Sequence, residues 1–199
     1  MYVVDSIPER LQKAEELGAV AVDFSEGDPV EQIFELRKIN KGITQSLRPG
    51  EEKMKGVDCA IDAVGYQARD DGNPDKEKAT QVLENCLKVV NATGAIGMIG
   101  VYIAPDPKAK NEEAKQGIFP FSLAEFFDKG ITMGSGQAPV KKYNEYLRDL
   151  IVNGRAKPSK IVSHRIPIDE APNAYDKFDK RVDGYTKVLI KFDEHKRAA

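Results

Sequence analysis

The first residues with a possible chemical role are an acid and a base near the start of the chain. Tyr2–Val4 is a short apolar run typical of a buried strand, and Asp5 stands at its carboxyl end. In a doubly wound fold, an acid after the second strand binds the ribose hydroxyls of a dinucleotide and repels a 2′-phosphate. Asp5 would therefore favour NAD over NADP, and Arg10 could lie against the adenine or its ribose. Solvated acids at strand ends are common, so Asp5 alone does not establish such a site.

Three further segments could line the same ligand. Asp62–Gly65 follows an expected strand, and Gly65 would allow the backbone to approach a cofactor, although an ordinary turn is an equal explanation. Three glycines (94, 97 and 100) lie inside a strand-like run, where they leave room either for a bound ring or for close packing. Gly134–Gly136 ends the next strand at the edge where open α/β sheets bind ligands, but taken alone it indicates only a turn.

No residues with the spacing of a metal site or a nucleophilic catalytic set are evident. His164 and His195 have no histidine, cysteine or carboxylate at metal-ligand spacing. Cys59 lies in an apolar strand and Cys86 in an expected helix, so the two do not form a disulfide framework. We therefore name no catalytic residue and no metal ligand, and we expect a reducing, cytoplasmic location.

Composition excludes several classes of function. The 199 residues contain 30 lysines and arginines against 32 aspartates and glutamates, a net charge of −2 that argues against a nucleic-acid surface. The chain has no apolar run long enough to span a membrane and no secretory signal pattern, and 41% hydrophobic residues suffice for a core.

The order of elements predicts an α/β fold. Strands are expected at 2–4, 20–24, 57–62, 94–102 and 131–135, and helices at 8–17, 29–38, 76–90 and 139–152. Ser6 and Glu9 should form a capping box for the first helix, and Asp28 should cap the second. Residues 40–56, 67–75 and 105–117 are expected as loops, and a short helix should follow Ser122. Two further strands, at 161–166 and 187–192, flank a helix that ends near 181.

The expected parallel sheet is incomplete. A doubly wound dinucleotide fold has the strand order 3-2-1-4-5-6, with a glycine-rich turn about 20 residues before the ribose-binding acid. Residues 2–4 would be its second strand, so the central first strand and its glycine turn are missing. The neighbours of that strand would then lack a hydrogen-bonding partner. We predict an incomplete Rossmann-like domain at 1–153 and a C-terminal segment of a catalytic domain at 154–199.

Several segments together resemble the zinc-containing medium-chain alcohol dehydrogenases, and among them most closely the glutathione-independent formaldehyde dehydrogenases. The resemblance covers nearly the whole chain and is most specific at 136–144, with further matches at 3–10, 57–69, 97–102 and 168–178. This sequence departs from the family at three positions: Ile99 replaces the family's proline, Asp71 replaces a histidine and Ala138 replaces a threonine.

The resemblance implies a set of NAD contacts. Asp5 and Arg10 would hold the adenosine, Val64 and Arg69 would line the ribose and pyrophosphate, and the remaining contacts would surround the nicotinamide: Ile99, Val101, Gly136 and Ala138. The family binds zinc through a domain that this chain lacks. The implied activity is hydride transfer from formaldehyde or a small alcohol to NAD, and we expect the isolated chain to be inactive.

Two other interpretations remain open. The chain could be a non-catalytic nucleotide-binding or subunit-interaction module. Such a module would pair with a full-length subunit or form a homo-oligomer. The chain could also be a methyltransferase, which likewise places an acid after its second strand, although 136–144 and 187–192 speak against this.

Overall fold

The computed structural model describes residues 1–39, 55–102, 107 and 112–192. The predicted loop at 40–56 lies almost wholly outside the described residues, and residues 107 and 112–117 of the predicted loop at 105–117 are described. The chain divides into two compact units, one formed by 1–6 and 18–138 and the other by 7–17 and 139–199. The predicted domain boundary after residue 153 stays a prediction.

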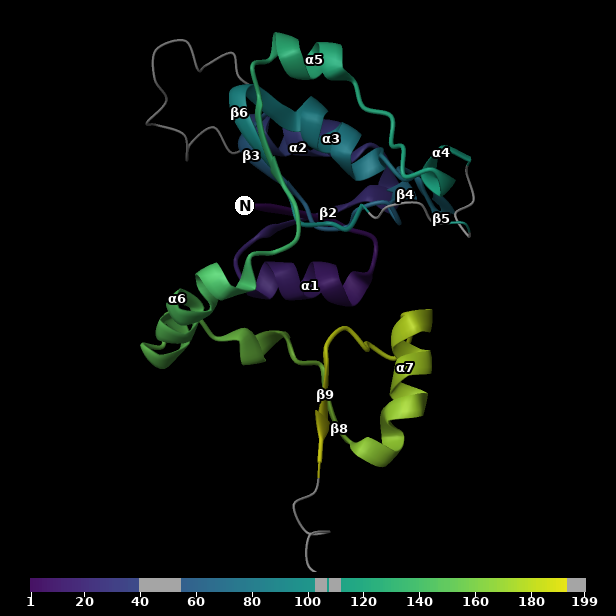
Figure 1. The fold of residues 1–199 in the computed structure, drawn as a ribbon, viewed down its shortest axis with the longest axis vertical. Helices are drawn as coiled ribbons and strands as arrows, with labels where there is room; N and C mark the ends of the chain where they lie inside the picture. Colours follow the sequence, from purple (N-terminus) through teal and green to yellow (C-terminus); the bar gives the residue numbers. More distant parts are fainter. Residues whose placement is uncertain (40–54, 103–106, 108–111, 193–199) are drawn as a thin grey trace, which may run out of the picture. The chain divides into compact units, whose positions relative to one another are not determined.

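The first unit contains the expected parallel strands, but in two separate sheets (Figure 1). β1 (Tyr2–Asp5) pairs in parallel with β2 (Val20–Asp23). β3 (Val57–Asp62), β6 (Val90–Met98) and β7 (Thr132–Ser135) form a second parallel sheet in the order β3-β6-β7. In the doubly wound order the missing strand would stand between β1 and β3. The predicted α/β class with parallel strands is confirmed, and the absence of a first strand stays a prediction.

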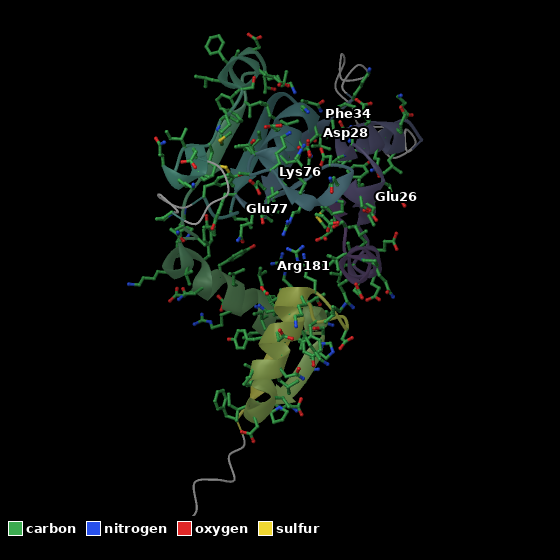
Figure 2. All side chains as sticks on the ribbon, turned by 90° about the vertical axis from the view of Figure 1, so that its right-hand side faces the viewer. Glu26, Asp28, Phe34, Lys76, Glu77 and Arg181 are labelled. Atoms are coloured by element: carbon green, nitrogen blue, oxygen red, sulfur yellow. The ribbon has the colours of Figure 1, made fainter. Side chains whose placement is uncertain are left out.

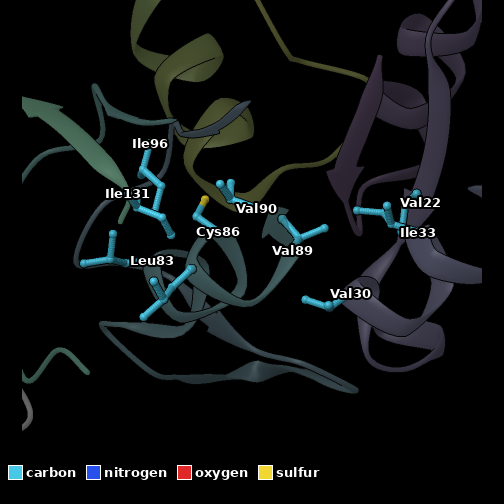
Figure 3. Close-up of a cluster of buried hydrophobic side chains, with 10 residues drawn as sticks. Val22, Val30, Ile33, Leu83, Cys86, Val89, Val90, Ile96 and Ile131 are labelled. Atoms are coloured by element: carbon cyan, nitrogen blue, oxygen red, sulfur yellow. The ribbon is translucent and has the colours of Figure 1, made fainter. Parts of the chain in front are cut away.

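One hydrophobic core joins the two sheets. α2 (Pro29–Ile39) packs against β2 and against α3 (Gln81–Val89), which in turn packs against β3 and β6. The core runs from Val22 on β2 through Ile33 on α2 to Leu87 on α3 and Ile96 on β6 (Figure 3). Val22, Leu87 and Ile96 are each 1% exposed, and complete burial of such a side chain contributes about 1.5–3 kcal/mol. The same helix layer therefore holds both sheets.

The prediction of a loop at 67–75 is wrong, because part of this segment forms an antiparallel hairpin. β4 (Arg69–Asp70) pairs with β5 (Asn73–Glu77) around Gly72, whose φ of +71° suits a tight turn. Figure 2 labels Lys76 and Glu77 on β5. The Gly72 N–H donates to the Phe24 carbonyl in η1 (Phe24–Glu26), which ties the hairpin to the end of β2. Consequently α3 begins five residues after the predicted start of the helix.

Other boundaries also differ from the predictions. The capping box is wrong: Ile7 is the N-cap of α1 (Pro8–Glu16) without a side-chain hydrogen bond, and the Ser6 N–H donates to the Asp5 carboxylate over 2.8 Å. Asp28 does cap α2, since its carboxylate accepts from the Val30 N–H over 2.8 Å. β6 begins directly after α3, four residues earlier than predicted. Two short helices follow, α4 (Glu112–Lys115) inside a predicted loop and α5 (Leu123–Asp128) after Ser122.

The second unit holds α1, α6 (Val140–Val152) and a parallel two-stranded sheet. β8 (His164–Pro167) pairs with β9 (Val188–Lys191), and α7 (Ala171–Lys180) connects them. The predicted strand at 161–166 begins three residues later, at His164, because residue 161 ends the 3-10 turn η3 (Pro158–Ile161). η4 (Ile168–Glu170) precedes α7. Within the described residues, no helix has the length and apolar character needed to cross a membrane.

Candidate nucleotide-binding edge

The carboxyl ends of β3 and β6 are joined by main-chain hydrogen bonds. The N–H groups of Ile99 and Gly100 both donate to the Asp62 carbonyl over 2.9 Å. Beyond the strands, Gly65 forms an isolated parallel bridge with Val101, and the Tyr66 N–H donates to the Val101 carbonyl over 3.0 Å. These bonds fix the two segments that follow β3 and β6 beside each other.

A buried carboxylate holds this junction together. Asp62 is 0% exposed, and its Oδ1 accepts from the N–H groups of Val64 and Gly65, each over 2.9 Å. Its Oδ2 accepts a 2.8 Å hydrogen bond from the Tyr102 hydroxyl. Burial raises the pKa of Tyr102, and its hydrogen bond to Asp62 and the charge of that residue add to the shift. Tyr102 therefore stays a neutral donor, and Asp62 positions the loop rather than acting on a ligand.

Three glycines allow the main chains to approach in contact. A Cβ on Gly65, whose φ is +83°, would lie 2.3 Å from the Val101 carbonyl oxygen. A Cβ on Gly100 would lie 2.2 Å from the Gly65 nitrogen, and one on Gly94 would lie 2.6 Å from the Asp58 carbonyl oxygen. At these three positions the absence of a side chain serves close packing between strands. A Cβ on Gly97 would meet only the Ile61 side chain, at 3.8 Å.

Apolar side chains stand exposed at this edge. Val64, Ile99 and Val101 are 51%, 66% and 50% exposed. Met98 pairs with Ser135 of β7, so Gly136 follows at the level of Ile99. We call Val64, Ile99, Val101 and Gly136 the carboxyl-edge surface. Open α/β sheets bind their ligands outside the carboxyl ends of the strands, and an exposed apolar surface bordered by a glycine suits a flat ring.

The remaining predicted contacts lie elsewhere. Ala138 is exposed two residues after Gly136, within the first unit. Asp5 ends β1 on the other sheet and is partly buried, while Arg10 lies on α1 in the second unit. The structure thus brings four of the eight predicted residues together at one edge, and the roles of all eight stay predictions.

Arg69 takes part in the hairpin. Its Nη1 donates to the Asp75 carbonyl over 3.3 Å and lies 3.6 Å from the Glu77 carboxylate. Its Nε is buried and has no hydrogen-bond partner. The guanidinium therefore braces β4 against β5.

Sequence reasoning missed the polar network around Asp71. Gln81 and Asn85, one turn apart on α3, donate to its carboxylate over 2.5 Å and 3.0 Å. Burial is the main cause of the raised pKa of Asp71, and the amide hydrogen bond from Asn85 partly opposes it. This network fixes the hairpin to α3. The spacing of two amides on one helix face was a signal that could have indicated it.

The described residues do not fit a zinc site. Across this part of the chain, no group of three histidines, cysteines or carboxylates lies close enough to hold a metal ion. Cys86 is buried, and burial together with the Asp62 charge raises its pKa to about 12, so its thiol is not a ready metal ligand or nucleophile. Cys59 is exposed on β3. We therefore derive no chemical step through a metal from these residues.

Comparison with known proteins gives related sequences and folds. No family model matches the chain. It is 34% identical over 186 residues to a glutathione-independent formaldehyde dehydrogenase of Pseudomonas aeruginosa, covering 92% of this chain and 43% of that protein. It is 33% identical to a formaldehyde dismutase of Pseudomonas putida, over 90% of this chain and 42% of that one.

Among solved structures, the alcohol dehydrogenase TADH from Thermus sp. ATN1 is similar with a TM-score of 0.68 and 30% identity, over 96% of this chain and 44% of that one. A zinc-dependent alcohol dehydrogenase 2 from Streptococcus pneumonia is similar with a TM-score of 0.65 and 25% identity, over 96% of this chain and 44% of that one. The chain spans less than half the length of the curated relatives it matches. In sequence and in fold, this protein therefore resembles the zinc-type alcohol dehydrogenases over the part of their length that it spans.

Proposed function

We propose that the chain is the NAD-binding portion of an oxidoreductase similar to the formaldehyde and alcohol dehydrogenases. The observation that carries this proposal is the carboxyl-edge surface, where the segments after β3 and β6 present exposed apolar side chains beside the glycine that follows β7. Ile99 and Val101 would face the nicotinamide, with Gly136 and Ala138 at its carboxamide. Val64 and Arg69 would line the path of the ribose and pyrophosphate.

The adenosine end would be bound at β1. Asp5 would accept hydrogen bonds from the ribose hydroxyls, as an acid after the second strand of a doubly wound sheet does, and Arg10 would contact the adenosine. A carboxylate there also repels a 2′-phosphate, which supports NAD rather than NADP. Residues 1–153 would form this incomplete domain, and 154–199 would belong to a catalytic domain.

The chain's own residues would bind and orient the nicotinamide ring. In such oxidoreductases the bound NAD accepts a hydride from the substrate, here formaldehyde or a small alcohol. The zinc of the related enzymes has no ligand set among the described residues, so we propose that the isolated chain has little or no dehydrogenase activity. With both cysteines unpaired, the chain would suit a reducing cytoplasm.

NAD binding by isothermal titration calorimetry tests the nucleotide site. We expect weak binding by the wild type and a loss of about ten-fold for Asp5→Ala, because a hydrogen bond to a charged group contributes about 1.5–3 kcal/mol. Asp23→Ala is the matched control, since Asp23 ends β2 as the register partner of Asp5. Equal affinities of both variants, or binding of S-adenosylmethionine in place of NAD, would contradict the proposal.

A second candidate is a non-catalytic module that pairs with another subunit, as a homo-oligomer or beside a longer relative. The observation that favours it is the division of the parallel strands into two sheets. Failure to bind NAD together with stable assembly in sedimentation velocity would support this candidate instead.

A further inference from the structure

A cluster of three aromatic side chains adjoins the carboxyl-edge surface. The Tyr102 and Phe119 rings meet edge to face, with their centroids 5.1 Å apart and their planes at 79°. The Tyr66 ring lies beside the same phenylalanine, with a centroid distance of 6.2 Å and an angle of 50° between the planes. Phe119 therefore contacts the segment that follows β3 and the segment that follows β6.

Both tyrosines are connected to Val101. The main-chain N–H of Tyr66 donates to the Val101 carbonyl over 3.0 Å, and Tyr102 is the next residue along the chain. The side chain of Val101 is 50% exposed at the carboxyl-edge surface. A movement of either tyrosine would therefore move the main chain that carries Val101.

Two contacts of different kinds restrain Tyr102. Its hydroxyl donates to the Asp62 carboxylate over 2.8 Å, which fixes the far end of the side chain. The edge-to-face contact with Phe119 fixes the tilt of the ring. Aromatic pairs prefer this arrangement because the positive edge of one ring meets the negative face of the other. Asp62 and Phe119 together thus define the position of Tyr102.

Phe119 belongs to the segment between α4 and α5, which is anchored on both sides of it (Figure 1). Before it, the Gly117 N–H donates to the carbonyl of Ala114 over 3.0 Å, and Ala114 is buried. After it, the Phe121 ring packs on the Phe126 ring with a centroid distance of 5.6 Å, and both pack against the hydrophobic core. The segment therefore holds the Phe119 ring in place against the two tyrosines.

The direction of the Val101 side chain follows that of its main chain. Valine is β-branched, so its χ1 angle has few allowed values once the main chain is fixed. A side chain that is fixed before a ligand arrives loses little conformational entropy on binding. Support from Phe119 should therefore increase the affinity for a ligand that lies on Val101.

We propose that Phe119 is a positioning residue for the nicotinamide half of bound NAD. Its ring fixes Tyr66 and Tyr102, and these hold Val101 where the nicotinamide would lie on it. The adenosine half, which we assign to Asp5 on the other sheet, does not depend on this cluster. The inference rests on the proposed function and adds a residue to it.

The test compares NAD with ADP-ribose, which contains every part of NAD except the nicotinamide, by isothermal titration calorimetry. Phe119→Leu keeps an apolar side chain but removes the ring. We expect this variant to bind NAD about three-fold or more weakly than the wild type, because its aromatic pairs are lost, and to bind ADP-ribose equally well. Phe119→Tyr retains the ring and should restore the NAD affinity of the wild type. Phe127→Leu is the matched control, since Phe127 is exposed on α5, and it should change neither affinity.

Binding by the wild type separates this inference from the proposed function. If the wild type binds NAD and Phe119→Leu binds it equally well, the inference is overturned and the proposed function stands. If the wild type binds no NAD, both are overturned. An equal loss of affinity for NAD and ADP-ribose in Phe119→Leu would indicate a general loss of structure and would overturn the inference alone.

Nuclear magnetic resonance of the nucleotide-free protein gives a readout that does not require binding. Phe119→Leu should shift the methyl resonances of Val101 and leave those of Val22, in the hydrophobic core beside β2, unchanged. Val101 resonances identical to those of the wild type would show that Phe119 does not position this residue.

Discussion

The Tyr102 hydroxyl donates a 2.8 Å hydrogen bond to the fully buried carboxylate of Asp62, a residue 40 positions earlier in the chain. The same carboxylate also binds the main-chain N–H groups of Val64 and Gly65. This carboxylate therefore adds side-chain hydrogen bonds to the main-chain bonds that hold the segments after β3 and β6 beside each other. Because these segments carry the exposed apolar residues of the carboxyl-edge surface, the stability of this junction and the shape of the proposed site are linked.

Replacing Tyr102 by phenylalanine should destabilise the protein. Tyr102→Phe leaves Asp62 Oδ2 buried without this donor, and loss of a hydrogen bond to a charged group costs about 1.5–3 kcal/mol. Urea unfolding followed by circular dichroism measures the change. Tyr143→Phe on exposed α6 is the control and should leave the midpoint within error. An unfolding free energy for Tyr102→Phe equal to that of the control would show that the hydrogen bond does not hold the junction.

Adding a methyl group at Gly65 should be more disruptive. In Gly65→Ala, the new Cβ would meet the Val101 carbonyl oxygen at 2.3 Å in a backbone conformation with φ of +83°. The backbone strain alone costs about 1–3 kcal/mol, and the segments would also have to move apart. Gly134→Ala is the control, because a Cβ there meets nothing within 4 Å. Thermal unfolding should separate the two variants clearly, and similar melting temperatures would contradict the close crossing.

The two cysteines should differ in reactivity toward iodoacetamide at pH 8. Cys86 is buried, and its pKa is raised to about 12 by burial and by the Asp62 charge, so its thiol stays protonated at that pH. Cys59 is exposed on β3 and should be alkylated first. Mass spectrometry of tryptic peptides reads out the order, and in urea both sites should react. Labelling of Cys86 before Cys59 in the folded protein would contradict the burial.

Local patterns predicted most of the elements, while long-range contacts decided the rest. Apolar runs indicated β1, β2, β3 and β7, and apolar residues at helical spacing indicated α1 and α3. The hairpin of β4 and β5 was missed because Asn73–Glu77 is polar, with no β-branched residue. Its pairing is supported by main-chain hydrogen bonds such as that from Gly72 to Phe24.

The candidate site was likewise only partly predictable. The rule that ligands bind at the carboxyl ends of parallel strands pointed to Gly134–Gly136, whereas Val64 and Ile99 came only from the family resemblance. The link between Asp62 and Tyr102 joins residues on different elements, and no short motif encodes it. The close approach of Gly65 to the main chain of Val101 is likewise a long-range contact that the sequence did not indicate.

Methyl-labelled nuclear magnetic resonance with added NAD shows directly whether the carboxyl-edge surface binds the nucleotide. We expect chemical-shift changes that saturate with NAD at the methyl groups of Val64, Ile99 and Val101. Ile166 and Leu189, on β8 and β9 of the second unit, are the internal controls and should not shift. Saturating shifts confined to methyl groups away from the carboxyl-edge surface, or no shift at any NAD concentration, would contradict this expectation.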